Sequence, residues 1–365
     1  MIQDKATTLQ IFFNVLIFVG LFRYTYLHRL KSNLKPNFII WLFILIFCLY
    51  SFWCSDYFHY QSLYYFPNAY HEHLEPFYVA LRDFCPTYTF FRFCIWGSSV
   101  LFLFLIVQRI QLNRMYVLFV FMSIFLLWFS YGRVTLAIMC AMYGITFLAI
   151  PLQSKIKSTI IALVFILISY FFHRSAIIIV VVSLVVNFIP FEKKTVIGLI
   201  LGVPIAVFFI DNYMLIFYEQ SGYMSDEEIM LMNNYANVES PSGNVNFGIG
   251  ARIMWFLQRW SVITMFFFLL YEHFMRNHLI PESYLIFFKV AFILVLCSVA
   301  FDYSAFPATF CTRIRIISVM PLLISYSAYI DNNGETRVSK SIMRFVSLNP
   351  IYTILYMMHC ASVNN

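Results

Sequence analysis

Residues 115–152 read MYVLFVFMSIFLLWFS YGR VTLAIMCAMYGITFLAIPL, which is two apolar runs separated by Tyr131, Gly132 and Arg133. A helix needs about 20 mostly apolar residues to cross the hydrocarbon layer of a membrane. Each run approaches that length, and neither contains a charged residue. The stretch therefore predicts two membrane-spanning helices joined by a short turn that carries an arginine.

The rest of the chain repeats this pattern. Of its 365 residues, 62% are apolar and only 11% are charged. The roughly 226 apolar residues suffice for about eleven spans, which excludes a folded soluble catalytic domain. Eleven apolar runs lie between short polar breaks, at residues 9–21, 38–52, 90–107, 115–130, 134–152, 159–172, 175–190, 195–210, 253–271, 284–300 and 312–330. We predict an all-α polytopic integral membrane protein with about eleven transmembrane helices, organised as a single transmembrane domain over residues 1–365.

Two further segments need separate interpretation. Residues 342–360 are apolar but interrupted by Arg344, Asn349 and Pro350, so we predict a membrane-surface or re-entrant helix there. Residues 211–252 form a long loop in which Ser225 and the three acids after it resemble a capping box, which predicts a short amphipathic helix. A lid over a cavity has this composition, and so does an ordinary connecting loop.

The basic residues predict which breaks face the cytosol, because translocation of lysine and arginine is disfavoured. Fourteen of the 24 fall in alternate breaks: Arg23, Arg29, Lys31, Lys35, Arg109, Arg114, Lys155, Lys157, Lys193, Lys194, Arg276, Arg337, Lys340 and Arg344. With eleven spans, this pattern predicts an outer N-terminus and a cytosolic C-terminus.

The other ten basic residues comprise eight arginines and two lysines: Lys5, Arg82, Arg92, Arg133, Arg174, Arg252, Arg259, Lys289, Arg313 and Arg315. A guanidinium remains charged when partly desolvated, and its planar fork suits phosphate or carboxylate. We therefore predict an outward-facing cavity that holds an anion, namely a diphosphate. Each arginine could instead snorkel to outer headgroups and pair with an acid. The net charge of +7 does not indicate nucleic acid, because no basic cluster or base-stacking motif accompanies it.

Two polar clusters suggest chemistry at the outer ends of the spans. Asp56 and Tyr60 follow the second run, and Glu75 comes shortly afterwards, among tyrosines that suit an interfacial belt or a sugar-stacking platform. The nearby histidines match no named zinc pattern, and we expect neither metal nor cofactor. His173 and Arg174 join two runs with almost no loop. An imidazole can accept a proton from an attacking hydroxyl while a guanidinium stabilises a phosphate leaving group, although such a hairpin tip could simply reach outer water.

The C-terminal third adds further arginines. Arg252 and Arg259 are seven residues apart at the start of the ninth run, so on a helix they share a face about 10 Å apart along the axis. Arg313 and Arg315 are two residues apart, so only one of them is expected to face the cavity. These arginines are candidate ligands of one extended anion or of two.

In their order, these motifs resemble the EpsG family of polysaccharide polymerases, which are related in function to the Wzy polymerases. The resemblance covers the first run to the eleventh. Its motifs are Asp56 with Tyr60, then residues 75–78 (EPFY), then Arg133 and Ala137 as Arg-x-x-x-Ala, and then residues 172–176 as Phe-His-x-Ser-Ala. Val134 differs from the glutamine that commonly follows this arginine in the family.

The resemblance implies a GT-C/Wzy-like helical bundle with an outward-facing cavity, in a bacterial inner membrane, with the N-terminus periplasmic and the 211–252 loop in the periplasm. The implied enzyme is a glycosyltransferase that polymerises undecaprenyl-diphosphate-linked oligosaccharide repeat units into exopolysaccharide, capsule or O-antigen. Donor and acceptor are both lipid-linked, and a flippase and a chain-length-regulating co-polymerase are the implied partners.

The candidate proton acceptors are His173, or else Asp56 or Glu75. The candidate substrate-binding residues are Arg133, Arg174, Arg252, Arg259, Arg313, Arg315 and Tyr60. A lipid-linked oligosaccharide flippase is the alternative function, but transporters favour internal repeats and interrupted helices, and no repeat is visible. A membrane acyltransferase is a third class, disfavoured because no acidic or second-histidine motif adjoins His173.

Overall fold

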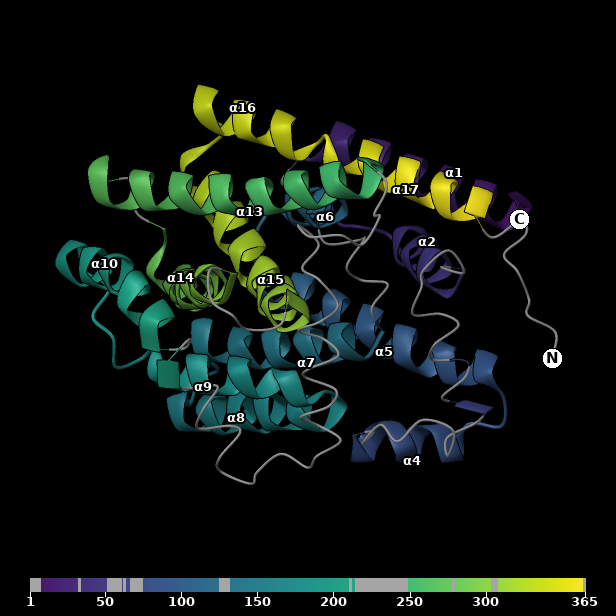
Figure 1. Cartoon of the computed structure of the whole chain (residues 1–365), viewed down its shortest axis with the longest axis horizontal. Helices are drawn as coiled ribbons and strands as arrows, with labels where there is room; N and C mark the ends of the chain where they lie inside the picture. Colours follow the sequence, from purple (N-terminus) through teal and green to yellow (C-terminus); the bar gives the residue numbers. More distant parts are fainter. Residues whose placement is uncertain are drawn as a thin grey trace.

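The computed structural model describes residues 8–31, 34–50, 61, 64–65, 75–124, 132–209, 212–213, 249–277, 280–302 and 308–363. Within them the regular structure is entirely helical (Figure 1). The helices are α1 (Thr8–His28), α2 (Phe38–Leu49), α4 (Pro76–Phe84), α5 (Tyr88–Arg109), α6 (Arg114–Ile124), α7 (Gly132–Ala149), α8 (Lys155–Phe172), α9 (Ile177–Val185), α10 (Lys193–Phe209), α13 (Ile249–Met275), α14 (Glu282–Asp302), α15 (Ala308–Asn333), α16 (Arg337–Val346) and α17 (Asn349–Val363), with a short 3-10 turn, η2 (Arg174–Ala176), between α8 and α9.

Each of the eleven predicted runs contains a helix in its described residues, but some helices end before the run does. The largest difference is α9, which covers only nine residues of the run at 175–190. Among the described residues, six helices are long and apolar enough to cross a membrane: Leu9–His28, Tyr88–Arg109, Gly132–Ala149, Lys155–Phe172, Glu282–Phe301 and Ile314–Asn333. Helices α2 and α6 are apolar but shorter. The chain is therefore a polytopic membrane protein, and it is all-α in the residues that the structure describes.

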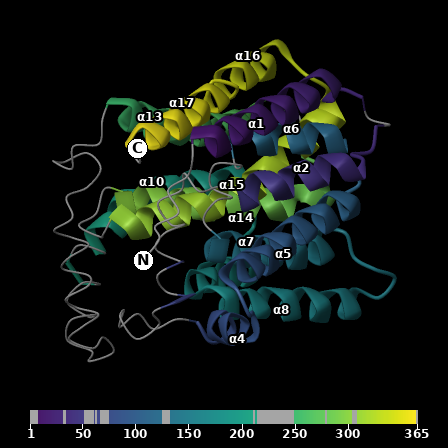
Figure 2. The ribbon, with the colours of Figure 1, turned by 90° about the vertical axis from the view of Figure 1, so that its right-hand side faces the viewer.

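The helices pack in layers. In both views α13, α16, α17 and α1 lie on one side and α8 with α4 on the opposite side (Figures 1 and 2). Helix α15 is the most buried of the six long apolar helices, with 89% of its apolar window inside the protein, and α7 follows at 83%. The same fraction for α8 is 28%, because its outer face carries large exposed apolar side chains such as Ile156, Ile160 and Leu167. Such a face is stable against lipid but not against water.

Helices α7 and α8 approach closely at Gly144. A Cβ atom at this position would lie 2.9 Å from the main-chain oxygen of Ala162 and 3.0 Å from Cγ1 of Ile166. Small residues at such crossings let two membrane helices approach within van der Waals contact of their backbones. This contact fixes the relative position of α7 and α8, whose ends carry the candidate site.

Three of the predicted cytosolic breaks contact one another in the structure. The Arg29 guanidinium, after α1, lies 3.4 Å from the Glu335 carboxylate, between α15 and α16. The side-chain amide of Asn113, before α6, donates to the carbonyl of Arg29 at 2.8 Å. Residues far apart in sequence thus gather at one end of the bundle, as the alternation of basic breaks predicts.

Two sequence interpretations change. We grouped Lys289 with the outer basic residues, but its ammonium donates to the carbonyl of Ile189 at 3.2 Å. Ile189 belongs to the break that carries Lys193 and Lys194, so Lys289 lies at the same end as the predicted cytosolic lysines. The C-terminal stretch divides into α16 and α17, because the helix stops at Ser347 and restarts at Asn349.

Candidate functional site

The site begins at the junction of Glu75 and Pro76. Proline has no N–H and a fixed φ, so it suits the first turn of a helix, and α4 indeed begins at Pro76. Glu75 is the N-cap residue, but its side chain makes no capping hydrogen bond. The carboxylate instead faces the start of α7 and the end of α8. Glu75 is buried there, at 5% exposure.

Arg133 pairs with this carboxylate. It is the second residue of α7, and its Nη1 donates to Oε2 of Glu75 at 2.9 Å. The same guanidinium lies over the ring of Tyr78, with Cζ 4.9 Å from the ring centroid. Tyr78 is one turn after Glu75 on α4, so this short helix supplies both an opposite charge and an aromatic face to one arginine. The contacts fix the guanidinium in a mostly buried position.

His173 lies beside the other oxygen of Glu75. It is the C-cap of α8, where φ −159° and ψ 126° turn the chain out of the helix. Its Nδ1 is 4.0 Å from Oε1 of Glu75, and His173 is 6% exposed. Nδ1 also accepts from the main-chain N–H of Ser175 at 3.1 Å and lies 2.7 Å from Oγ of Ser175. One carboxylate therefore faces a guanidinium on one side and an imidazole on the other.

Apolar contacts hold these polar groups together. The ring of Phe77 on α4 meets the ring of Phe172 on α8 edge-on, with centroids 4.4 Å apart. Phe172 belongs to a buried cluster with Ala137 on α7 and Ala176 on η2, both 1% exposed. Ala137 is one turn after Arg133 on α7, so the small residues of the two motifs let η2 pack against α7. This packing explains the spacing of both motifs.

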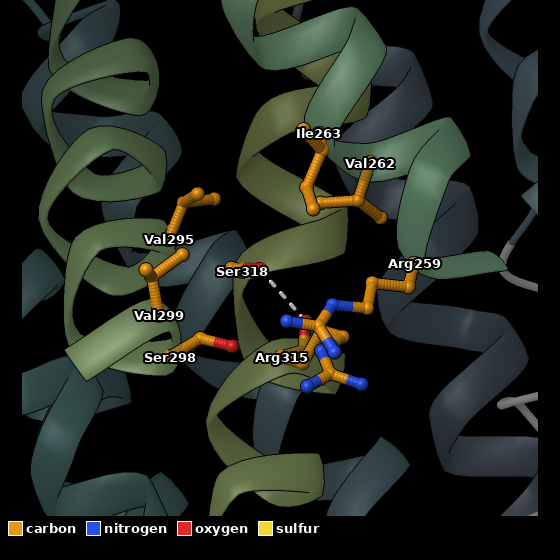
Figure 3. Close-up of a pocket in the computed structure, with 8 residues that line it drawn as sticks. All are labelled: Arg259, Val262, Ile263, Val295, Ser298, Val299, Arg315 and Ser318. Carbon is orange, nitrogen blue, oxygen red and sulfur yellow. Dashed lines mark hydrogen bonds between the residues drawn. The ribbon is translucent and has the colours of Figure 1, made fainter. Parts of the chain in front are cut away.

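A second group of predicted residues lines a pocket between α13, α14 and α15 (Figure 3). Arg259 on α13 and Arg315 on α15 direct their guanidinium groups toward the same opening, and Arg315 is 8% exposed. Ser298 and Ser318 add hydroxyl groups, and four aliphatic side chains complete the wall. Guanidinium and hydroxyl groups are donors of the kind that bind phosphate oxygens.

The remaining predicted site residues are less fully placed. The main chain of Arg174 lies in η2, that of Arg252 in α13 and that of Arg313 in α15, whereas their side chains lie outside the described part. Asp56 and Tyr60 also lie outside it, as do almost all residues of the 211–252 loop. In the described part of the chain, no group of three His, Cys, Asp or Glu side chains could hold a metal ion. His59, His71 and His73 fall outside that search.

The sequence did not assign a role to Ser175, and it grouped Tyr78 only with the tyrosines of an interfacial belt or sugar-stacking platform, not with Arg133. Both stand inside quoted motifs, and their spacing is the signal that could have found them. Tyr78 is three residues after Glu75, which places both at the start of one helix, and Ser175 is two residues after His173 across a helix end. Arg92, one of the arginines predicted to be on the outer side, donates to the carbonyl of Cys48 at 3.2 Å, near the end of α2.

The fold and these groups define a polytopic membrane protein with two sets of charged residues built on helix ends and helix faces. A family model described as the EpsG family matches residues 37–365. The chain therefore belongs to the EpsG family, which places it in exopolysaccharide biosynthesis and confirms the predicted resemblance. No curated protein and no solved structure gives a significant match to the chain.

Proposed function

We propose that this protein polymerises lipid-linked oligosaccharide repeat units into an extracellular polysaccharide. The observation that carries the proposal is the cluster of Glu75, Arg133 and His173, which brings a carboxylate, a guanidinium and an imidazole together at the ends of α4, α7 and α8. Family membership supports the pathway. The arginine pocket supports a diphosphate-linked substrate.

The donor is an undecaprenyl-diphosphate-linked glycan, and the acceptor is a second lipid-linked repeat unit. A hydroxyl oxygen at the non-reducing end of the acceptor attacks the anomeric carbon of the donor. The bond between that carbon and the phosphate oxygen breaks, and the lipid diphosphate leaves with the electron pair. The acceptor hydroxyl loses its proton to a protein base, which is His173, or else Asp56 or Glu75.

The arginines divide into two roles in this proposal. The fork of Arg133 is oriented by Glu75 and Tyr78, so it is preorganised for charge that develops next to it. Arg259 and Arg315 converge on a pocket that offers several donors to the diphosphate. Arg252 is on α13 with Arg259, and Arg313 is on α15 with Arg315, whereas Arg174 lies in η2 next to His173. Tyr60 adds a sugar-stacking ring.

The location follows from the charge pattern. We place about eleven helices across a bacterial inner membrane, with the end that carries Arg29 and Glu335 in the cytosol and the Glu75 cluster in the periplasm. The meeting of the basic breaks at one end supports this arrangement. The periplasm contains no nucleotide sugars, so an activated donor there must be lipid-linked. A flippase would deliver the substrate, and a co-polymerase would set chain length.

The test is reconstitution of the purified protein with a lipid-diphosphate-linked repeat unit from its own host. A ladder of lengthening products, with free lipid diphosphate released in equal number to new glycosidic bonds, would support a polymerase. The matched control is Arg337→Gln, at the exposed start of α16, which should leave the ladder unchanged. Unaltered substrate that crosses the bilayer of the liposomes would instead indicate a flippase and contradict the proposal.

A further inference from the structure

The Nδ1 nitrogen of the His173 ring faces three groups: the main-chain N–H of Ser175, the hydroxyl of Ser175 and, farther away at 4.0 Å, the Glu75 carboxylate. The main-chain N–H decides which role the nitrogen takes. The main-chain N–H of Ser175 points at Nδ1 over 3.1 Å, and a peptide N–H can donate but never accept. Nδ1 must therefore be unprotonated in the arrangement that the structure shows. A neutral imidazole then carries its single proton on Nε2.

The local chain geometry explains this contact. Helix α8 ends at His173, and η2 begins one residue later with a hydrogen bond from the N–H of Ala176 to the carbonyl of His173 at 2.9 Å. His173 thus stands in the N-cap position of η2, and its Nδ1 accepts from the second N–H of the turn, as a serine or aspartate oxygen does at other helix starts. The backbone conformation of this turn therefore makes Nδ1 a hydrogen-bond acceptor.

Ser175 strengthens the same arrangement with its side chain. Its Oγ lies 2.7 Å from Nδ1, and since that nitrogen carries no proton, the hydroxyl is the donor. The opposite tautomer would place an N–H at Nδ1, directly facing the N–H of Ser175. Two donors would then oppose each other in a position that is 6% exposed, where water cannot easily intervene.

We infer that His173 carries its proton on Nε2 and serves the reaction as a hydrogen-bond donor to the phosphate oxygens of the departing lipid diphosphate, with Ser175 as the positioning residue that fixes this tautomer. This role rests on the proposed function. The proton remains on Nε2 throughout, while negative charge grows on the phosphate oxygen as the glycosidic carbon–oxygen bond breaks. The proton of the acceptor hydroxyl then passes to a carboxylate, Glu75 or Asp56, and not to the imidazole.

The proton position can be measured without any activity. Protein labelled with ¹⁵N-histidine is compared with the His173→Gln variant, and the difference spectrum isolates the two ring nitrogens of His173. We expect the resonance of a protonated nitrogen for Nε2 and that of an unprotonated nitrogen for Nδ1. The reverse assignment, or a pair of averaged resonances from exchanging tautomers, would overturn the inference.

The donor role is tested by two amide substitutions in the polymerisation assay. The amide nitrogen of glutamine can occupy the position of Nε2, whereas that of asparagine can occupy only the position of Nδ1. We expect His173→Gln to retain at least tenfold more polymer synthesis than His173→Asn, with both variants confirmed as folded by gel filtration and thermal unfolding. Equal loss in both variants would overturn the donor role, because neither amide can replace a base. His28→Gln, at the opposite end of the bundle, is the matched control.

The two tests separate this inference from the proposed function. A wild-type protein that shows the expected tautomer but forms no polymer would contradict the polymerase and the role of His173 in it. A wild-type protein that forms polymer but shows the reverse tautomer would contradict only the inference.

Discussion

Glu75 and Arg133 are 58 residues apart in the chain, yet their side chains form a 2.9 Å ion pair that links the start of α4 to the start of α7. Both side chains are largely buried, at 6% and 13% exposure. The pair joins a short helix to the central helix of the bundle, and it fixes the carboxylate that faces His173. The arrangement of the site therefore depends on this contact.

The first prediction concerns removal of one partner. Glu75→Gln leaves the Arg133 guanidinium buried opposite a neutral amide, and loss of one member of a buried pair costs about 3–5 kcal/mol. Thermal unfolding in detergent should show this loss for Glu75→Gln. The double variant with Arg133→Gln should be less destabilised than the two single changes added together.

Asp83→Asn is the matched control for that measurement. Asp83 also pairs with an arginine, Arg82, at 2.8 Å, but its side chain is 61% exposed. An exposed pair of this kind contributes about 0–1 kcal/mol. Equal destabilisation by Glu75→Gln and Asp83→Asn would contradict the buried pair.

The sequence predicted the helices well because the bilayer imposes their length and composition. The runs at 115–130 and 134–152 contain no charge, and the break between them contains Arg133, so both α6 and α7 could be located before the structure was known. In residues 342–360 the polar residues near Asn349 indicated an interruption, and the structure has the division between α16 and α17 there.

The partners of each helix could not be predicted in the same way. Lipid chains are as apolar as leucine, so an apolar face does not show whether lipid or another helix covers it. Glu75, Arg133 and His173 come from three distant segments, and the sequence alone could only place them on one side of the membrane. The predicted side of Lys289 was wrong for a related reason. Lys289 lies inside an apolar run, and the sequence does not show that its ammonium reaches the carbonyl of Ile189 on another segment.

The second prediction concerns the crossing of α7 and α8. Gly144→Leu would force the two helices apart, because even a Cβ atom there would lie 2.9 Å from the carbonyl oxygen of Ala162. We expect a lower unfolding temperature and reduced polymer synthesis, since Arg133 and His173 lie on these two helices. Gly202→Leu on α10 is the control, because no atom lies within 4 Å of a Cβ at that position. Similar effects of both changes would contradict the close crossing.

The third prediction concerns the thiol that follows α4. Burial raises the pKa of the Cys85 thiol to about 11, and the thiol of Cys94, 4.0 Å away, adds to this effect. Only the thiolate reacts with iodoacetamide, so alkylation of Cys85 should increase about tenfold per pH unit between about pH 8 and 10. Mass spectrometry of the tryptic peptide 83–92 measures the rate.

An exposed cysteine supplies the reference for this pH profile. The reference is Asp83→Cys in a background where Cys85 is replaced by serine. Its alkylation rate should stop rising once the pH passes the ordinary thiol pKa of 9.0. If the alkylation rate of Cys85 itself stopped rising near pH 9, the thiol would be solvated, which would contradict its burial against α5.

The fourth prediction concerns sidedness. A membrane-impermeant maleimide applied to intact spheroplasts should label Asp83→Cys, at the end of α4, but not Lys340→Cys on α16. Both positions are exposed in the structure, so access from the outside is the only difference between them. Labelling of Lys340→Cys in intact spheroplasts, with Asp83→Cys protected until the membrane is permeabilised, would show that the orientation is reversed.

The most direct test of the proposed reaction centre compares Glu75→Gln with Asp83→Asn in the reconstituted polymerisation assay, using only the monodisperse fraction of each protein. We expect Asp83→Asn to make a product ladder like that of the wild type, and Glu75→Gln to bind the lipid-linked repeat unit but make no ladder. A ladder of wild-type length and rate from Glu75→Gln would contradict the assignment of the Glu75, Arg133 and His173 cluster as the place of sugar transfer.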